Sequence, residues 1–204
     1  MEKRNIGILA SMSWNSKRWC STATVEDTKH SNFDYVKENG WMHEDLNFAH
    51  EILPCESDGK FIAYTPMFNK FPSETESKYV DIVFFRSVNY NTKKNSIIGF
   101  YAFPDIKHHN RLANHKLYKN YDYGNVASLP ENIVLFKTTI EISNEIADKE
   151  NYIPTGKKLG QQGFNYLKYE NVLKLLDKAT QLNPDDSKLK RIKLKFLSES
   201  KYHA

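Results

Sequence analysis

Three tryptophans in the polar first third of the chain, Trp14, Trp19 and Trp41, carry the most weight among its candidate functional residues. All three lie outside the segments that favour strands most strongly. A flat indole ring stacks on a nucleobase, and a methylated base is held by stacking and apolar contact. The same rings would also suit the ends of a barrel core. The pattern therefore leaves two interpretations open, an aromatic box for a base and structural caps.

Groups typical of catalysis or metal binding do not form a recognisable motif. His43 and His50 are seven residues apart, so they lack the i, i+4 spacing of a helical zinc site. The glycine-rich segment 156–163 lacks the lysine and hydroxyl that follow the last glycine of a P-loop. We therefore expect no catalytic residue, metal or cofactor, and we interpret the acidic residues as solvated surface. These acidic residues are Glu44, Asp45, Glu51, Asp81 and Asp105.

The strongest structural signal lies in residues 79–103, the segment that would position the candidate functional side chains. Two β-prone runs, 79–88 and 96–103, flank the Asn- and Lys-rich link 89–95. β-branched and aromatic residues suit a pleated surface, and the link has turn chemistry. Gly99 stands among bulky neighbours, which predicts a bulge or a close approach by a ligand or another backbone. The segment is predicted to be the central hairpin of a small barrel.

Shorter elements surround this hairpin. Residues 11–30 are predicted to be a loop, and the polar segment 104–131 is predicted to be a long loop of the kind that is often functional. Asn39 and Gly40 are expected to stop a short helix that Ser31 caps. Strands are predicted over 5–10, 60–65 and 133–140, and helical segments over 31–38 and 41–52.

Two amphipathic helices close the chain. Residues 183–186 are expected to supply a cap, a proline at the first helical position and acidic groups for the last helix. Lysines and an arginine surround its apolar stripe and are interpreted as a solvated face. The inward residues are predicted to be Tyr169, Val172, Leu173, Leu176 and Ala179 in the helix 167–182, and Leu189, Ile192, Phe196 and Leu197 in the last helix.

Composition bounds the class of protein. The chain has 204 residues, 40% of them hydrophobic and 13% aromatic, which fits one domain or one domain with an appendage. No segment approaches the roughly 18 consecutive apolar residues of a membrane span. Cys20 and Cys55 give no disulfide framework, so a reducing cytoplasm is expected. A net charge of +4 permits contact with polyanions without requiring it.

Several of these segments resemble a known group of domains. Val80–Phe85 followed by Ile97–Ala102 is similar to the paired central strands of EVE and YTH domains, which belong to the PUA-like barrels. The segment 133–137 resembles their later strand, and 167–182 resembles their closing helix. Trp19-Cys20-Ser21-Thr22 is similar to a Trp-Cys-Ser-Thr stretch of YTH domains, where the tryptophan forms a wall of the methyladenine cage.

The resemblance implies an α+β fold with a small PUA-like β-barrel flanked by helices. The reader domain would cover residues 1–166, followed by a closing helix and a basic C-terminal helix over 167–204. It also implies a non-enzymatic protein that flips a modified base, most readily in DNA, into an aromatic pocket. Such readers occur in restriction systems, so a motor or nuclease partner is expected.

Within this scheme Trp19 forms a pocket wall, and other aromatic residues complete it. Base contacts are expected from Trp14, Asn15, Trp19, Cys20, Ser21, Trp41, Tyr118, Tyr121 and Tyr123. Phosphate contacts are expected from Lys17, Arg18, Lys107 and Arg111. Two alternatives stay open, namely an RNA-binding or RNA-processing protein or nuclease with an unrecognised site, and a protein-interaction module built on the last two helices.

Overall fold

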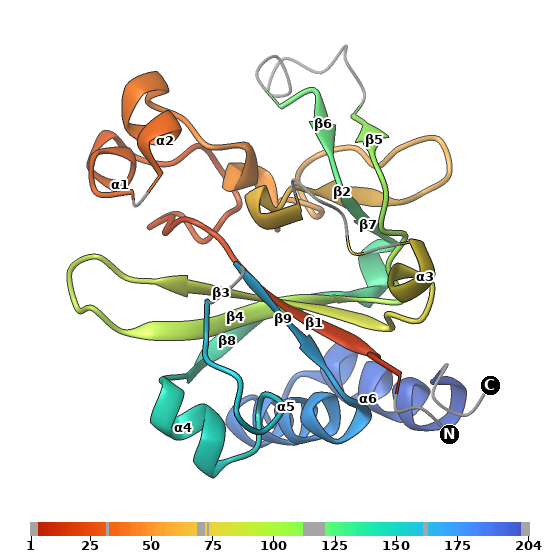
Figure 1. Ribbon diagram of the computed structural model, residues 1–204. Coiled ribbons are helices and arrows are strands. Elements are labelled where there is room, and N and C mark those ends of the chain that lie inside the picture. Colours follow the sequence, from red (N-terminus) through yellow and green to blue (C-terminus); the bar gives the residue numbers. More distant parts are fainter. Residues whose placement is uncertain are drawn as a thin grey trace.

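The computed structural model describes residues 4–31, 33–68, 72, 74–111, 121–160 and 163–200. Its centre is a mixed five-stranded sheet with the strand order β8-β4-β3-β1-β9 (Figure 1). β8 and β9 form the two edges, so this sheet is open among the described residues. The predicted α+β class is confirmed. The five strands are β1 (Gly7–Ser11), β3 (Ile82–Val88), β4 (Asn95–Ala102), β8 (Ile133–Glu141) and β9 (Phe164–Leu167).

The predicted central hairpin is confirmed as β3 and β4, which pair antiparallel with Phe84 opposite Phe100. Gly99 pairs with Phe85, and the register shifts directly after that pair. A Cβ atom at Gly99 would collide with the carbonyl oxygen of Val134 and the ring of Phe48. The glycine therefore marks both a bulge and a close approach of the neighbouring strand, as its position predicts.

Both faces of the central sheet are covered, which explains the almost unbroken apolar run of β3. Ile82 and Phe84 belong to the core below the sheet, whereas Val83 and Phe85 belong to the core above it. Successive side chains of a strand point to opposite faces, so a strand buried on both faces is apolar throughout. Arg86 interrupts this run and is itself buried.

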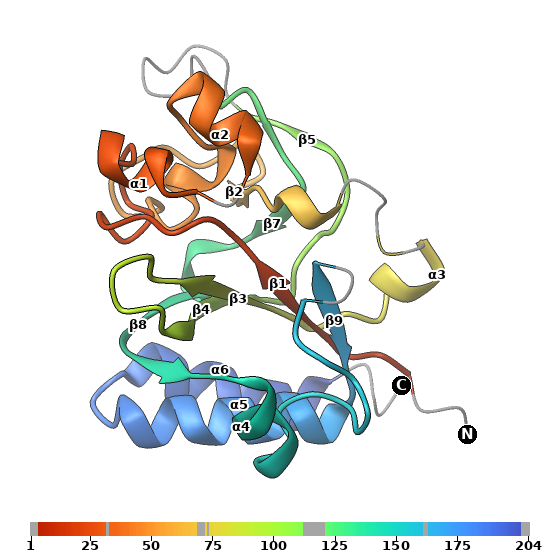
Figure 2. The same ribbon diagram turned by 60° about the vertical axis from the view of Figure 1, so that its left-hand side comes forward.

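Three helices form the lower layer, α4 (Asn144–Lys149), α5 (Tyr169–Leu182) and α6 (Ser187–Glu199) (Figure 2). Residues 164–167, which precede α5, form the edge strand β9 against β1, which local periodicity did not predict. Helix α6 begins at Ser187, because the Asp186 carboxylate caps it by accepting from the Leu189 N–H at 2.9 Å. The predicted proline at the first helical position is therefore wrong.

The predicted inward faces of α5 and α6 are largely confirmed. Val172, Leu176 and Ala179 are buried, and so are Leu189, Ile192 and Phe196. Two assignments were wrong. Helix α5 buries Leu175 and leaves Leu173 half-buried, and Leu197 of α6 is 38% exposed.

The upper layer consists of short segments. Two antiparallel ribbons, β2 (Phe61–Ala63) with β7 (Val126–Ser128) and β5 (His109–Asn110) with β6 (Tyr123–Gly124), lie beside short helices. The long loop predicted over 104–131 therefore contains three of these strands. The short helices are α1 (Val25–Lys29), α2 (Asp34–Asn39) and α3 (Glu74–Ser77), with 3-10 turns at His43–Leu46 and Pro66–Phe68. A further 3-10 turn, Pro130–Asn132, directly precedes β8 and contacts helix α6 of the lower layer.

Local capping explains where the two first helices lie. Thr24 and Asp27 form a capping box that starts α1, inside a segment predicted to be a loop. Gly40 ends α2 in the left-handed conformation with φ 72°, as expected from its position. Ser31 does not cap α2, because its hydroxyl accepts instead from the Phe33 N–H at 3.1 Å.

Buried polar side chains hold the upper layer together. The Asn47 side chain accepts from the Tyr64 N–H at 2.8 Å and donates to the Tyr64 carbonyl at 2.7 Å. Asn125 binds the backbone of Thr65 in the same way, with two distances of 2.9 Å. These amides replace strand partners where β2 ends, so the strand is shorter than the predicted 60–65. Within the described part of the chain, every helix is too short or too polar to span a bilayer.

The expectation that the acidic residues are solvated is wrong for three of them. Glu44, Asp45 and Asp81 are buried. The Glu44 carboxylate accepts from the Ser13 N–H at 3.0 Å, and Asp81 accepts from the Ser200 hydroxyl at 2.8 Å. These carboxylates are therefore internal hydrogen-bond acceptors that fix loops and the end of α6.

Candidate functional site

A small pocket lies where the parallel strands β1 and β3 end side by side. Met12 continues the pairing beyond β1, because its N–H donates to the Arg86 carbonyl at 3.0 Å. The pocket has a volume of about 150 Å³, which is enough for one benzene-sized ring. We call it the strand-end pocket, and its walls include Trp14, His30, Phe33, Arg86, Gly160 and Gly163.

Trp14, and not Trp19, supplies the tryptophan wall of this pocket. Trp19 is only 2% exposed and its indole N–H donates to the Ser13 carbonyl at 3.0 Å. The two rings meet edge to face with centroids 5.6 Å apart. Arg18 and Trp19 both have positive φ angles, 58° and 55°, an uncommon conformation for bulky residues that turns Trp19 inward. The assignment of Trp19 as a pocket wall is therefore corrected, since its ring is part of the core.

A buried hydrogen-bond network fixes the loop that carries Trp14. The Asn15 amide donates to Asp45 at 2.8 Å and to the Ser21 carbonyl at 3.0 Å, and its oxygen accepts from the Lys17 N–H at 2.7 Å. The Tyr121 hydroxyl donates to Asp45 at 3.0 Å. Burial raises the pKa of Asp45 to about 6. Asn15, Ser21 and Tyr121, which were expected to contact the base, therefore position the loop from outside the pocket.

Trp41 and Tyr123 belong to a separate group of rings around His43, which we call the His43 cluster. The His43 ring lies 4.6 Å from Trp41, 4.7 Å from Tyr64 and 4.8 Å from Tyr123, measured between centroids. Burial lowers the pKa of His43 to about 4, so the ring is neutral at pH 7. None of these rings lines the strand-end pocket. Tyr118 lies outside the described residues.

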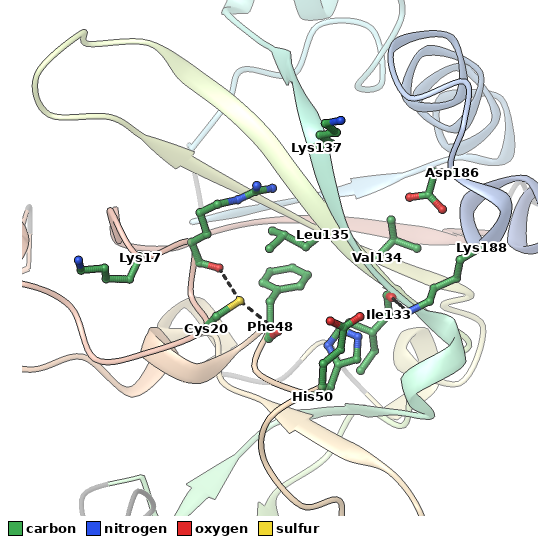
Figure 3. A pocket seen from close by; sticks show the side chains of 12 residues that line it. Lys17, Cys20, Phe48, His50, Ile133, Val134, Leu135, Lys137, Asp186 and Lys188 are labelled. Atoms are coloured by element: carbon green, nitrogen blue, oxygen red, sulfur yellow. Dashed lines mark hydrogen bonds between the residues drawn. The ribbon is translucent and has the colours of Figure 1, made fainter.

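A wider basic groove of about 630 Å³ borders the same loop (Figure 3). It runs between the loop, β8 and the start of α6. Four cationic side chains line it, and two carboxylates, Glu51 and Asp186, reduce its net charge. The four cations that define this basic groove are Lys17, Arg18, Lys137 and Lys188.

Contacts to backbone carbonyls orient several of the groove side chains. An Arg18 Nη donates to the Phe136 carbonyl at 2.6 Å, and Lys188 Nζ donates to the Ile133 carbonyl at 3.3 Å. Cys20 Sγ donates to the Arg18 and Phe48 carbonyls at 3.3 and 3.4 Å. Burial raises the pKa of the Cys20 thiol, so the thiol stays protonated. The structure thus brings the predicted residues Lys17 and Arg18 together with Cys20, which lines the groove instead of the pocket.

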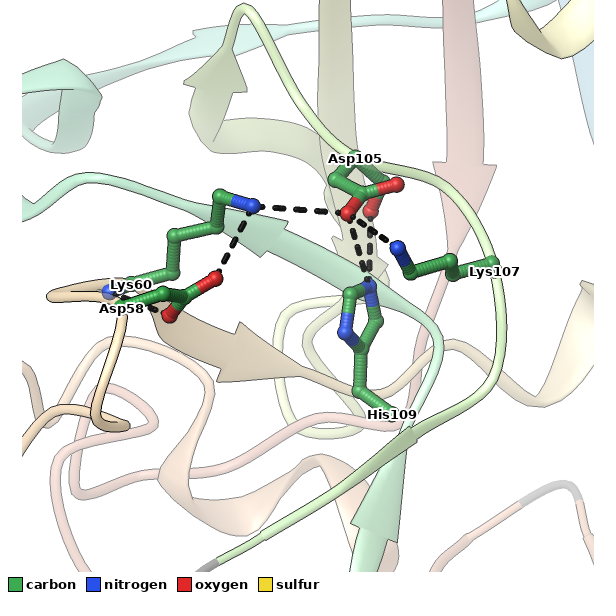
Figure 4. Close-up of polar contacts among 5 residues, drawn as sticks. All are labelled: Asp58, Lys60, Asp105, Lys107 and His109. Atoms are coloured by element: carbon green, nitrogen blue, oxygen red, sulfur yellow. Dashed lines mark hydrogen bonds and ion pairs between the residues drawn. The ribbon is translucent and has the colours of Figure 1, made fainter.

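The other two predicted phosphate ligands lie elsewhere. Lys107 pairs with Asp105 at 2.9 Å, and Asp105 also faces Lys60 at 3.4 Å and His109 at 4.0 Å (Figure 4). The charge of Lys107 is therefore partly compensated within this surface cluster. Lys107 does not line the basic groove.

Arg111 is buried in the upper layer, with 4% of its surface exposed. Its guanidinium donates to the Ile62 carbonyl at 3.1 Å and to the Tyr121 carbonyl at 3.4 Å. A phosphate cannot reach a group enclosed in this way. The expectation that Arg111 binds phosphate is therefore corrected, since it joins two backbone segments.

Sequence reasoning missed Phe33, His30 and Arg86 as pocket residues. A signal for Arg86 was present, because it is a charged residue that directly follows the apolar run 82–85 within a predicted strand. Phe33 and His30 lie in polar surroundings and carried no such signal. Among the described residues, no group of three or more His, Cys, Asp or Glu side chains is arranged to hold a metal ion.

Comparisons with profiles of protein families, with curated proteins and with solved structures gave no match. The inference of function therefore depends on the geometry of the pocket and the groove.

Proposed function

We propose that this protein is a non-enzymatic reader of a modified nucleobase, most readily in DNA. The base ring enters the strand-end pocket and stacks on Trp14, while the basic groove holds backbone phosphates. One observation carries the proposal. A single rigid loop, residues 13–20, presents an aromatic ring to a pocket of one-ring size and two cations to a neighbouring groove.

The energies of a base stack and of phosphate contacts suit these two separate roles of the pocket and the groove. A base stacked on an aromatic side chain contributes about 1–3 kcal/mol, and any base has a flat face. Phosphate contacts add affinity that depends on salt and carries no sequence information. Extrusion of a base from a duplex costs a few kcal/mol, and least for a mismatched or single-stranded base. A pocket that stacks on the base and a groove that binds phosphates together supply the energy that offsets the extrusion of the base.

The proposal includes a PUA-like relationship of the EVE/YTH type and a place in a restriction or defence system beside a motor or nuclease subunit. The adjacent strands β1, β3 and β4, with the pocket at the ends of β1 and β3, support it. The pocket wall differs from the YTH-like assignment, because Trp14 takes the place expected for Trp19. Both cysteines are free thiols, which suits a cytoplasmic reader.

Binding by matched variants tests the proposal. We expect the wild-type protein to bind oligonucleotides that carry one modified base more tightly than unmodified ones, measured by fluorescence anisotropy. Trp14→Ala should weaken this binding by about 1–3 kcal/mol, the contribution of one stack. Trp41→Ala removes another half-buried tryptophan, outside the pocket, and serves as the control.

Each other outcome has a distinct meaning. If Trp41→Ala loses binding and Trp14→Ala keeps it, the base site is the His43 cluster. If the wild-type protein binds no oligonucleotide, the reader function is wrong and the interaction module of the last two helices becomes the better hypothesis. Cleavage of an oligonucleotide in the presence of a divalent metal would instead favour a nuclease.

A further inference from the structure

Arg86 is a charged residue that is buried within the central sheet. Its side chain is 6% exposed, and its Nε has no hydrogen-bond partner. Among the described residues the guanidinium takes part in no ion pair, and burial is the influence that lowers its pKa. An unpaired buried charge is costly, and such groups persist where the surrounding fold enforces them. Arg86 is therefore unlike the other buried arginine, Arg111, whose guanidinium donates to backbone carbonyls.

The guanidinium forms part of the wall of the strand-end pocket. Gly160 also lines this pocket, and a Cβ atom there would lie only 3.1 Å from an Nη of Arg86. Gly160 has φ 82°, so this position favours glycine on two grounds. A register shift directly before Arg86 sets its side chain apart from the regular alternation of β3.

A neighbouring depression of about 390 Å³ also borders Arg86. The carboxylate of Glu141 lines this depression and already has a partner. Glu141 pairs with Lys94 at 3.1 Å. Lys93 adds a further positive charge to this depression. The surroundings of Arg86 are therefore basic and aromatic, which favours a ligand that offers hydrogen-bond acceptors.

We propose that Arg86 reads the edge of the base and selects a base with two neighbouring acceptor atoms, so that the modified base is a cytosine and not an adenine. Cytosine offers O2 and N3, and guanine offers O6 and N7, as acceptors for the planar fork of an arginine, but only the single ring of cytosine matches the one-ring size of the pocket. Adenine places its amino group, a donor, beside both N1 and N7. This inference rests on the proposed reader function and names its substrate class.

A panel of oligonucleotides with one variable position tests this selection. The position carries cytosine, 5-methylcytosine, guanine, adenine or N6-methyladenine, and binding is measured by fluorescence anisotropy. We expect the wild-type protein to prefer cytosine and 5-methylcytosine over the adenine class by about 5- to 150-fold, the usual effect of one bidentate contact, and to bind guanine weakly because of its second ring. Arg86→Met should abolish this preference, and Arg86→Lys should retain a small part of it. Lys17→Met, which removes a charge from the groove, should weaken all oligonucleotides about equally.

Thermal unfolding without DNA gives a second readout, because a binding role and a structural role of Arg86 predict opposite changes in the Tm of the Arg86→Met variant. Arg86→Met should raise the Tm, because it removes an unpaired buried charge while keeping an unbranched side chain. A lower Tm together with an unchanged preference would mean that Arg86 is structural. If Arg86→Met does not fold, the preference of Arg86→Lys decides, since this variant keeps the charge.

The two proposals fail in different ways. A wild-type protein that binds none of the oligonucleotides overturns the reader function and the role of Arg86 with it. A wild-type protein that prefers guanine or N6-methyladenine, or folded Arg86 variants that keep the wild-type preference, would overturn only the inference about Arg86.

Discussion

The two faces of the central sheet are covered by unlike kinds of structure. Below the sheet, the regular helices α5 and α6 bury aliphatic and aromatic side chains in one continuous core. Above it, short helices and two-stranded ribbons surround a second core in which buried amides, carboxylates and an arginine join the segments. Hydrogen bonds with specific geometry therefore join the short segments of the upper layer, which have no long regular helix to pack against the sheet.

The comparison shows how the protein separates stability from binding. Apolar packing against a regular helix is non-directional and needs only a periodic stripe. Loops can be held in irregular shapes only if their backbone groups find partners, which the polar residues of the upper layer supply. The pocket and the groove lie on the loop after β1 that the network of Asn15 and Asp45 fixes. Binding sites are commonly carried by loops on a rigid scaffold, as here.

The largest effect is expected in the lower layer. Phe196 is fully buried and stacks on Tyr169 with centroids 5.2 Å apart. Phe196→Ala should lower the free energy of unfolding by about 3–5 kcal/mol, because it leaves a cavity in the core. Urea denaturation measures this loss. Leu197→Ala, one residue further along the helix and 38% exposed, should change stability by less than about 1 kcal/mol. Equal losses from both variants would contradict the described orientation of α6.

A smaller loss is expected when one amide of the upper layer is removed. Asn47→Ala leaves both the N–H and the carbonyl of Tyr64 without their side-chain partner. It should lower the free energy of unfolding by about 2 kcal/mol, since each unsatisfied buried group costs about 1–3 kcal/mol and Tyr64 is only half-buried. Asn91→Ala, at an exposed position of the β3–β4 turn, is the control and should stay within about 0.5 kcal/mol. If the two variants are equally stable, the amides do not hold the upper layer.

Acid should weaken the upper layer through His43. The folded pKa of His43 is about 4, below its ordinary value near 6.5, so the unfolded chain binds a proton first as the pH falls. The stability that the neutral ring contributes is therefore present above pH 6.5 and is lost between pH 6.5 and about 4. Because the ring is half-buried, we expect this loss to reach about 1–2 kcal/mol.

His43→Phe keeps the ring contacts and removes the titration, so it isolates this effect. The difference in unfolding free energy between the variant and the wild type should grow in favour of the variant from pH 7 to pH 4.5. The comparison has to be made between the two proteins, because Asp45 acts in the opposite direction. Its raised pKa makes protonated Asp45 favour the folded state at low pH. A difference that does not change with pH would mean that His43 is not buried as a neutral ring.

The smallest effect on folding is expected in the basic groove. Lys17→Ala should leave the unfolding free energy within about 0.5 kcal/mol and flatten the slope of log affinity against log salt by about 0.7–0.9. Lys174→Ala removes an exposed lysine from helix α5 in the lower layer and should leave that slope unchanged. If Lys174→Ala flattens the slope as well, the phosphate-binding surface extends to the lower layer.

The sequence by itself determined the elements that depend on local patterns. The hairpin β3–β4, the role of Gly99, the two closing helices and the end of α2 at Gly40 all follow from residue periodicity and glycine stereochemistry. These features involve residues within a few positions of one another, or a run of β-prone residues that continues along one strand. The edge strand β9 was missed because its identity depends on its partner β1, which lies more than a hundred residues earlier.

Only the tertiary structure decided which side chains form the site. Trp14 and Trp19 are five residues apart in the same polar loop, yet one lines the pocket and the other is core. The sequence predicts exposed, phosphate-binding side chains for both Arg111 and Lys17. In the structure, Arg111 is enclosed by backbone carbonyls that come from distant segments. The sequence therefore identified the loop after β1 and two of its cations, but not Phe33, His30 or Arg86. Burial of a loop residue depends on which distant segments pack against it, and no local pattern encodes that choice.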